Sequence, residues 1–181
     1  LIEVIEKKNF STTEVHLLAS SKSVGKKIKF NGKDHIVEDL ETFDFSKVKI
    51  AFFAAGSAVA EKWVLKAAKN TIVIDNSKYF RKDPEIPLIV PEVNSNELSK
   101  FKNKNIIANA NCSVIPIVVA LKPLHDLYNV KRIVASTYQS VSGVGKDGMD
   151  ELISQTREVL ENKNVTSKNF TKQIAFNAIP H

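Results

Sequence analysis

The sequence predicts an α/β fold in which a doubly wound parallel sheet alternates with helices. Nearly continuous apolar runs recur along the chain, as in "KIAFFAAG" (49–56) and "NIIANAN" (105–111). Between them lie segments with apolar residues at helical spacing, as in "SAVAEKWVLKAAKN" (57–70). Strands and helices in this alternation are typical of a parallel sheet covered on both faces.

The individual elements follow from local signals. Residues 1–10 carry apolar side chains at helical spacing without a start signal, and we interpret them as the end of a helix. A strand over 14–20 precedes two short strands around an Asn31-Gly32 turn. Ser57 is the expected N-cap of the helix over 57–70. The remaining expectations are strands over 49–56, 71–77, 87–93, 105–111 and 131–143, and helices over 113–127 and 146–160.

Composition indicates a globular protein, and its basic excess is compatible with handling small anions such as phosphates. Of the 181 residues, 43% are apolar, and 26 lysines and arginines against 20 acidic residues give a net charge of +6. The basic residues are scattered, so we expect no nucleic-acid partner. No apolar run approaches the roughly 18 residues of a membrane span, and no signal segment precedes the first strand. With one cysteine and no zinc-ligand spacing, we expect no metal and a cytoplasmic location.

Candidate site residues follow the predicted strands, because ligands bind outside the carboxyl ends of parallel strands. These positions are rich in small residues that let backbone amides approach a ligand, and helix starts favour negative charge. The candidates are Lys22 and Ser23 in "SSKSVGK", Arg81 in "YFRKDP", Asn111 and Cys112 in "NANCS", Gln139, and Ser142 and Gly143 in "SVSGVG".

Each candidate also has a plainer interpretation. Cys112 precedes an expected helix, where free N–H groups favour a thiolate, but a lone cysteine is equally often a small buried hydrophobe. Arg81 suits a phosphate or carboxylate, or a surface salt bridge. Lys22 could simply be solvated, and Gln139 could bind either a ligand or a buried backbone group.

Four motifs in order, "LLASSKSVGKKIKFNGK", "NSKYFRKDPEIPLIVPEVN", "NANCS" and "STYQSVSGVGK", together resemble bacterial aspartate-semialdehyde dehydrogenases. The resemblance implies a Rossmann-like NADP-binding domain over 1–112 and the start of an α+β catalytic and dimerisation domain over 113–181. It implies NADPH-dependent reductive dephosphorylation of L-aspartyl 4-phosphate to L-aspartate 4-semialdehyde. That reaction serves lysine, threonine, methionine and diaminopimelate biosynthesis. The family forms homodimers or higher homo-oligomers.

The same resemblance gives roles to single residues. Cys112 matches the nucleophile that forms an acyl-thioester, and Gln139 matches the glutamine that orients the substrate. Arg81 and Asn111 match residues of the phosphate site. At the cofactor, Lys22 and Ser23 match contacts to the adenosine end of NADP. The family's loop at Ser142 and Gly143 also approaches the cofactor.

The chain departs from the family pattern at three places. Ala110 stands where the family usually has proline, directly before Asn111 and Cys112. The family's first strand and its glycine-rich pyrophosphate turn precede the point where this sequence begins. Its acid–base histidine lies beyond "FNAIPH", so His181 is that motif's own last residue and not the catalytic one. We therefore expect residues 1–181 alone to lack dehydrogenase activity.

Two other interpretations remain open at this point. One is a related acyl-phosphate reductase, such as N-acetyl-glutamyl-phosphate reductase or glyceraldehyde-3-phosphate dehydrogenase, although "STYQSVSGVGK" argues against both. The other is a non-catalytic remnant that acts as a binding or assembly module. In-frame copies of the glycine turn upstream and the histidine motif downstream would indicate a full enzyme.

Overall fold

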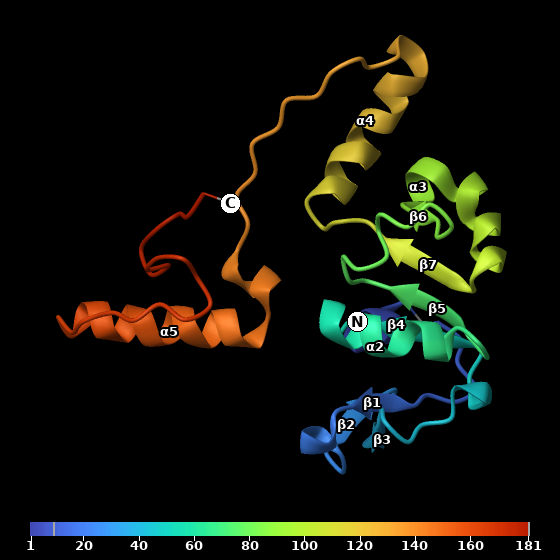
Figure 1. Cartoon of the computed structure of the whole chain (residues 1–181), viewed down its shortest axis with the longest axis horizontal. Helices are drawn as coiled ribbons and strands as arrows, with labels where there is room; N and C mark the ends of the chain where they lie inside the picture. The colour runs from blue at the N-terminus through green and yellow to red at the C-terminus, as the bar shows by residue number, and fades with distance from the viewer. Residues whose placement is uncertain (9, 181) are drawn as a thin grey trace. The chain divides into compact units, whose positions relative to one another are not determined.

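The structure is a computed structural model that describes residues 1–8 and 10–180 (Figure 1). It divides into two compact units, Leu1–Asn111 and Cys112–His181. Each unit has its own elements and is described separately below. His181 lies outside the described residues.

A four-stranded parallel sheet forms the centre of the first unit. Its strands are β4 (Ile50–Phe53), β5 (Ile72–Asp75), β6 (Leu88–Ile89) and β7 (Ile106–Asn109), in the order β4-β5-β7-β6. All three pairings are parallel. The predicted α/β fold with a parallel sheet is therefore confirmed.

One face of this sheet is buried against helix α2 (Ser57–Ala67). Val64 and Ala67 of the helix are fully buried in the same apolar cluster as Val73 and Ile106 of the strands. Burial of each of the three larger side chains, those of Val64, Val73 and Ile106, stabilises the fold by about 1.5–3 kcal/mol.

Coverage of the other face of the sheet is incomplete at its edge strand β4. Ile50 and Phe52 point away from the buried face, and each is 41% exposed. They alternate with partly or fully buried Ala51 and Phe53, as a pleated strand requires. Nearly continuous apolar runs therefore mark strand positions here without showing that both faces are covered.

The start of α2 also differs from the prediction. Gly56 is the N-cap, with φ of 88°, and Ser57 is already the first helical residue. Glycine reaches this left-handed backbone region without a steric penalty, which lets the chain turn directly from the end of β4 into the helix. No side-chain capping bond forms at this end of the helix.

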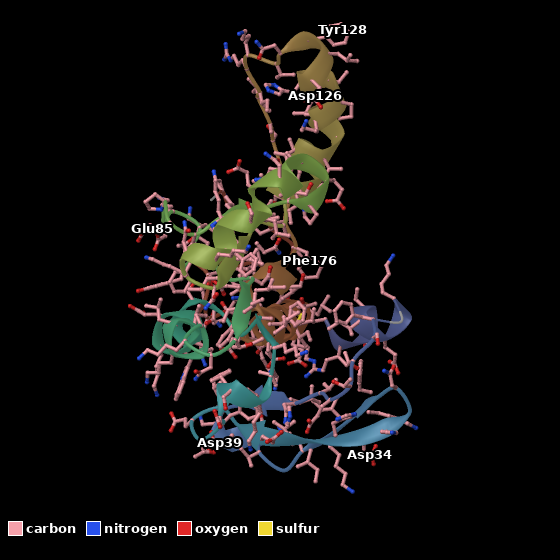
Figure 2. The ribbon with its side chains drawn as sticks, turned by 90° about the vertical axis from the view of Figure 1, so that its right-hand side faces the viewer. Asp34, Asp39, Glu85, Asp126, Tyr128 and Phe176 are labelled. Carbon is pink, nitrogen blue, oxygen red and sulfur yellow. The ribbon has the colours of Figure 1, made fainter. Side chains whose placement is uncertain are left out.

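A second, three-stranded sheet is separate from the first. It has the order β1-β3-β2, with β1 (Leu17–Ala19) parallel to β3 (Lys33–Asp39) and β2 (Lys27–Phe30) antiparallel to it. Asp34 and Asp39, near the two ends of β3, are labelled in Figure 2. Strand β1 is not part of the four-stranded parallel sheet, because its ladder partner is β3.

The turn of this sheet is the one the sequence predicts. Asn31 and Gly32 have φ of 48° and 75°, as a two-residue hairpin turn of the primed kind requires. Helix α1 (Ile2–Lys7), the predicted helix end, reaches this turn through Glu6, whose Oε1 accepts a bond of 2.8 Å from the Asn31 N–H.

Short elements complete the first unit. The predicted strand over 87–93 is reduced to β6, because Pro91 begins helix α3 (Pro91–Asn94). Proline is accepted at a first helical position but donates no ladder bond. Asn94 Oδ1 accepts from the Val90 N–H at 2.9 Å and so closes the turn into this helix. The 3-10 segments are Ser21–Ser23, Phe45–Lys47 and Ser95–Asn103.

The second unit contains two long helices, α4 (Val114–Tyr128) and α5 (Lys146–Leu160), and a 3-10 turn, Val141–Val144. Helix α4 ends at Asn129, whose φ of 53° is a left-handed C-cap. Asp126 and Tyr128, labelled in Figure 2, lie in its last turn, where Asp126 pairs with Lys122. No helix within 1–8 and 10–180 is both long and apolar enough to span a bilayer.

The strand predicted over 131–143 does not form. Residues 131–140 run without a ladder, and Val134 and Tyr138 are 80% and 95% exposed. Apolar alternation sets a strand's faces, but a ladder also requires a partner strand, and the described part of 112–181 offers none.

Helix α5 holds the chain that follows it through two buried polar side chains. Glu151 Oε1 accepts from the Lys168 N–H at 2.9 Å, and Oε2 accepts from the Asn169 N–H at 2.6 Å. Gln155 Oε1 accepts from the N–H groups of Ile174 and Ala175 at 2.8 and 3.2 Å. We refer to Glu151 and Gln155 together as the α5 clamp.

The α5 clamp predicts an acid-sensitive C-terminal segment. Burial raises the pKa of Glu151, but hydrogen bonds from the backbones of Lys168, Asn169 and Phe170 lower it by more. The resulting pKa lies below the ordinary value of 4.5. A carboxyl with a lowered folded pKa stabilises the fold above its unfolded pKa and loses that effect as the pH falls through the folded value. Amide protection at Lys168 and Asn169 should therefore fall in acid, below pH 4.5.

Hydrogen exchange of residues 1–181 from about pH 6 to about pH 3 measures this directly. Glu151→Gln should remove the acid step, whereas Glu161→Gln at the exposed end of α5 should retain it. Protection at Lys168 and Asn169 that stays constant through the acid range would contradict the assignment.

Candidate active site

Arg81 lies at the carboxyl edge of the parallel sheet, between the ends of β5 and β7. Its Nε donates to the Asn109 carbonyl at 2.9 Å, and its Nη2 donates to the Asn76 carbonyl at 3.1 Å. Asn109 Nδ2 also donates to Asn76 Oδ1 at 2.7 Å. Two of the five guanidinium N–H groups therefore fix the plane of the head group at this edge. This geometry differs from the surface salt bridge that was the plainer interpretation.

A buried carboxylate shapes the segment that carries Arg81. Asp75, the last residue of β5, is fully buried and accepts from the Ser77 N–H at 3.0 Å and from Ser77 Oγ at 2.7 Å. Ser77 Oγ in turn accepts from the Tyr79 N–H at 3.1 Å. These bonds take the place of the strand's ladder bonds where β5 ends, and they fix the conformation of the turn that leads to Arg81.

The cysteine is exposed and stands immediately before a helix. Helix α4 begins at Val114 with Ser113 as its N-cap, so Cys112 precedes the cap by one residue. The interpretation of Cys112 as a small buried hydrophobe is therefore wrong for this structure. Asn111 is also exposed, and it follows Ala110, which is 4% exposed.

Gln139 lies beside this cysteine although 27 positions separate them in the sequence. Its Nε2 is 3.7 Å from Cys112 Sγ, within the range for a bond to sulfur, and it also donates to Ser113 Oγ. An amide donor next to an exposed thiol can hold a polar group, such as a carbonyl oxygen, close to the sulfur. The second unit therefore brings together two of the predicted residues.

Ser142 and Gly143 form the 3-10 turn that leads into α5. Ser140 Oγ accepts from the Ser142 N–H at 3.2 Å, and the Gly143 N–H donates to the Ser140 carbonyl at 3.2 Å. The turn packs tightly on the helix, since a Cβ added at Gly148 would stand 2.8 Å from the Val144 Cβ. Glycine at 148 therefore permits this close approach.

Lys22 and Ser23 lie in the 3-10 segment after β1, in the three-stranded sheet. The Ser23 N–H donates to the Ser20 carbonyl at 2.9 Å, and the Lys22 side chain is exposed. The sequence reasoning placed the candidates at the ends of parallel-sheet strands. Lys22 and Ser23 instead follow a strand of the three-stranded sheet.

An open cavity in the second unit contains Gln139. Its volume is about 690 Å³, and its lining includes Gln139, Ser140, Leu152, Ile174, Phe176 and Asn177. Among these lining residues, sequence reasoning identified Gln139 and missed the other five, and it also missed the α5 clamp. A signal existed, because Gly148, Glu151 and Gln155 repeat at helical spacing and are the buried residues of α5. Polar residues on a buried helix face indicate backbone partners.

A parallel sheet with polar side chains at the carboxyl ends of its strands is typical of the α/β proteins that bind ligands at this edge. Comparison with known proteins gives a narrower result. Residues 1–101 match the family model described as the semialdehyde dehydrogenase NAD binding domain. Residues 121–181 match the model described as the semialdehyde dehydrogenase dimerisation domain. The chain therefore belongs to the semialdehyde dehydrogenase family.

Individual relatives agree with this assignment. The chain is 49% identical over 181 residues to aspartate-semialdehyde dehydrogenase 2 of Vibrio cholerae, a match that spans 99% of this chain and 54% of the relative. A crystal structure of aspartate semialdehyde dehydrogenase II complexed with ASA, also from Vibrio cholerae, has a TM-score of 0.95 at 48% identity, over 99% of this chain and 54% of the other.

A more distant structure is that of the Candida albicans enzyme with NADP, which has a TM-score of 0.55 at 27% identity. It covers 71% of this chain and 43% of the other. The chain spans about half the length of the curated relatives it matches.

Proposed function

We propose that residues 1–181 contribute the cofactor-binding region and the nucleophile of an aspartate-semialdehyde dehydrogenase. The reaction is the NADPH-dependent reductive dephosphorylation of L-aspartyl 4-phosphate to L-aspartate 4-semialdehyde and phosphate. The observation that carries this proposal is the exposed Cys112 with the Gln139 amide 3.7 Å from its sulfur, in a chain of this family. The product then serves lysine, threonine, methionine and diaminopimelate biosynthesis.

Cys112 is the nucleophile in this proposal. Its thiolate attacks the acyl carbon of the acyl phosphate, a C–S bond forms, and the bond between that carbon and the phosphate oxygen breaks with its electron pair leaving on phosphate. The acyl group is thereby held as a thioester, which splits one difficult step into two easier ones. Gln139 donates its Nε2–H to the substrate and orients it toward the sulfur.

Arg81 and Asn111 are the proposed phosphate ligands. A guanidinium presents parallel N–H groups that match phosphate oxygens, and the two bonds to the carbonyls of Asn109 and Asn76 hold its plane. The leaving group carries negative charge, so a fixed cation stabilises its departure. Asn111 adds a neutral amide donor.

The residues at the strand and helix ends fit an anionic dinucleotide. At Gly56, nothing lies within 4 Å of the position a Cβ would take, so the end of β4 and the start of α2 stay open to a ligand. An 11-residue helix starting there favours negative charge.

Lys22 and Ser23 are the proposed contacts to the adenosine end, where a lysine suits a 2′-phosphate. Ser142 and Gly143 are the proposed contacts of the second unit. NADPH, when bound, supplies the hydride that reduces the thioester.

The names of the relatives support the proposed substrate and cofactor. One solved relative was crystallised with ASA and another with NADP. The match to a dimerisation domain supports a homodimer or a higher homo-oligomer as the working assembly.

The test is turnover by the complete enzyme that carries residues 1–181. Nicotinamide absorbance should rise with NADP, aspartate semialdehyde and phosphate together, and should not rise when phosphate is left out. N-acetylglutamate semialdehyde and glyceraldehyde 3-phosphate serve as matched aldehydes. Turnover with either of these, and none with aspartate semialdehyde, would assign the chain to a different acyl-phosphate reductase.

A further inference from the structure

We propose that Gln155 is a positioning residue that holds one wall of the substrate cavity beside Gln139. The wall is the turn formed by residues 173–178, and Phe176 is its side chain facing the cavity. This inference rests on the proposed function, because it takes the cavity around Gln139 as the substrate site.

The first argument is the burial and bonding of Gln155. It is 1% exposed, and both the oxygen and the nitrogen of its side-chain amide form hydrogen bonds. Oε1 accepts from two backbone N–H groups of the turn, while Nε2 donates to Glu151 Oε1 at 2.9 Å, to the Thr166 carbonyl at 3.2 Å and to Ser167 Oγ at 3.3 Å. A buried amide with this many partners fixes its neighbours in one arrangement, since leaving any of them unpaired is costly.

The second argument is the conformation of the turn. Phe176 has φ of 55°, which is rare for a bulky side chain and strains the backbone. Such a conformation persists only when neighbouring contacts impose it. Here the Asn177 N–H donates to the Ile174 carbonyl at 3.1 Å, and Asn177 Nδ2 donates to the Gln173 carbonyl at 2.9 Å.

The third argument is where the turn lies. Ile174, Phe176 and Asn177 line the same cavity as Gln139. Phe176, labelled in Figure 2, is 72% exposed, so it fills no apolar core in the described residues. An aromatic ring held at the edge of this cavity offers an apolar surface to the acyl group that Gln139 orients. The strained turn and the α5 clamp therefore serve the cavity.

The test is steady-state kinetics of Gln155→Glu in the complete enzyme. The new carboxylate can still accept from the Ile174 and Ala175 N–H groups, but it cannot donate to Glu151 and it repels that carboxylate. The KM for aspartate semialdehyde should rise about tenfold, while the KM for NADP should change less than about twofold. Within 1–8 and 10–180, Glu151 is the titratable side chain that bonds the Gln155 side chain.

The pH profile separates positioning from general damage. In the Gln155→Glu variant at lower pH, the carboxyls at positions 151 and 155 share a proton, which restores a hydrogen-bond donor at position 155. The KM for aspartate semialdehyde should then recover toward the wild-type value. Ser154→Glu is the matched control, because it adds the same charge to an exposed position of α5. It should leave both KM values unchanged.

Phe176→Leu tests the wall without touching the clamp, and covers the case in which Gln155→Glu fails to fold. It should also raise the KM for aspartate semialdehyde and leave that for NADP unchanged. Unchanged KM values in both variants, with or without a lower melting temperature, would overturn the proposal. If instead the wild-type enzyme does not turn over aspartate semialdehyde at all, the proposed function fails and this inference falls with it.

Discussion

Replacing Cys112 with alanine in the complete enzyme is expected to reduce turnover by about four orders of magnitude or more. The acyl group has no other thiol in this chain to bond to, because Cys112 is its single cysteine. The fold should be unaffected, since the Cys112 side chain is exposed and fills no core position. Cofactor binding should therefore persist in the inactive variant.

Two measurements check this expectation. Turnover is compared between wild type and Cys112→Ala, with the melting temperature as the control for folding. A thiol reagent should then inactivate the wild-type enzyme in proportion to labelling of Cys112, and aspartate semialdehyde should slow that labelling. Substantial turnover by the alanine variant would show that Cys112 is not the nucleophile.

Replacing Arg81 with lysine is expected to raise the KM for phosphate by about 10- to 100-fold, with little effect on the KM for NADP. Lysine keeps the charge but loses the planar group that bonds the Asn109 and Asn76 carbonyls. The remaining cation would be neither fixed in its plane nor able to bind phosphate through two parallel bonds.

Lys82→Gln provides the matched control, because it removes a whole positive charge from the neighbouring, exposed position. If overall charge near the site were what matters, Lys82→Gln would weaken phosphate use as much as Arg81→Lys does. An unchanged dependence on phosphate in Arg81→Lys would remove Arg81 from the phosphate site.

The parts of the fold that sequence could predict are those whose causes are local. The Asn31-Gly32 turn is predictable because few residues adopt two successive positive φ angles, and this pair is one that does. The apolar run over 105–111 is equally predictable as a strand, and Ile106 and Ala108 are fully buried. Helix α5 formed within its predicted limits, because its apolar spacing is set within the segment itself.

The failures have causes at longer range. The run over 131–143 has a strand's pattern but no partner in the described chain, so the pattern alone does not produce a ladder. The N-cap of α2 is displaced from Ser57 to Gly56 because the chain turns immediately after β4, which requires a positive φ. The composition of β1 predicts a strand but does not indicate that it pairs with β3 in a separate sheet.

The candidate site divides in the same way. Arg81 and Cys112 could be identified by residue type, by their place after a strand and by the motifs around them. Glu151 and Gln155 were missed, because their spacing indicates only a buried polar face of α5. The backbone N–H groups that they bind are carried by every residue but proline, so the sequence does not show which ones they are.

The hairpin between β2 and β3 also sets the order in which the first unit assembles. Its strands are joined by two residues, Asn31 and Gly32, and a hairpin of this size forms within about 1–10 μs. The pairing of β5 with β7 must instead close the loop formed by residues 76–105 before any ladder bond compensates for the lost chain entropy. We therefore expect β2–β3 to fold first and β1 to join it through β3. The parallel sheet with its Arg81 edge would be the slower step of folding.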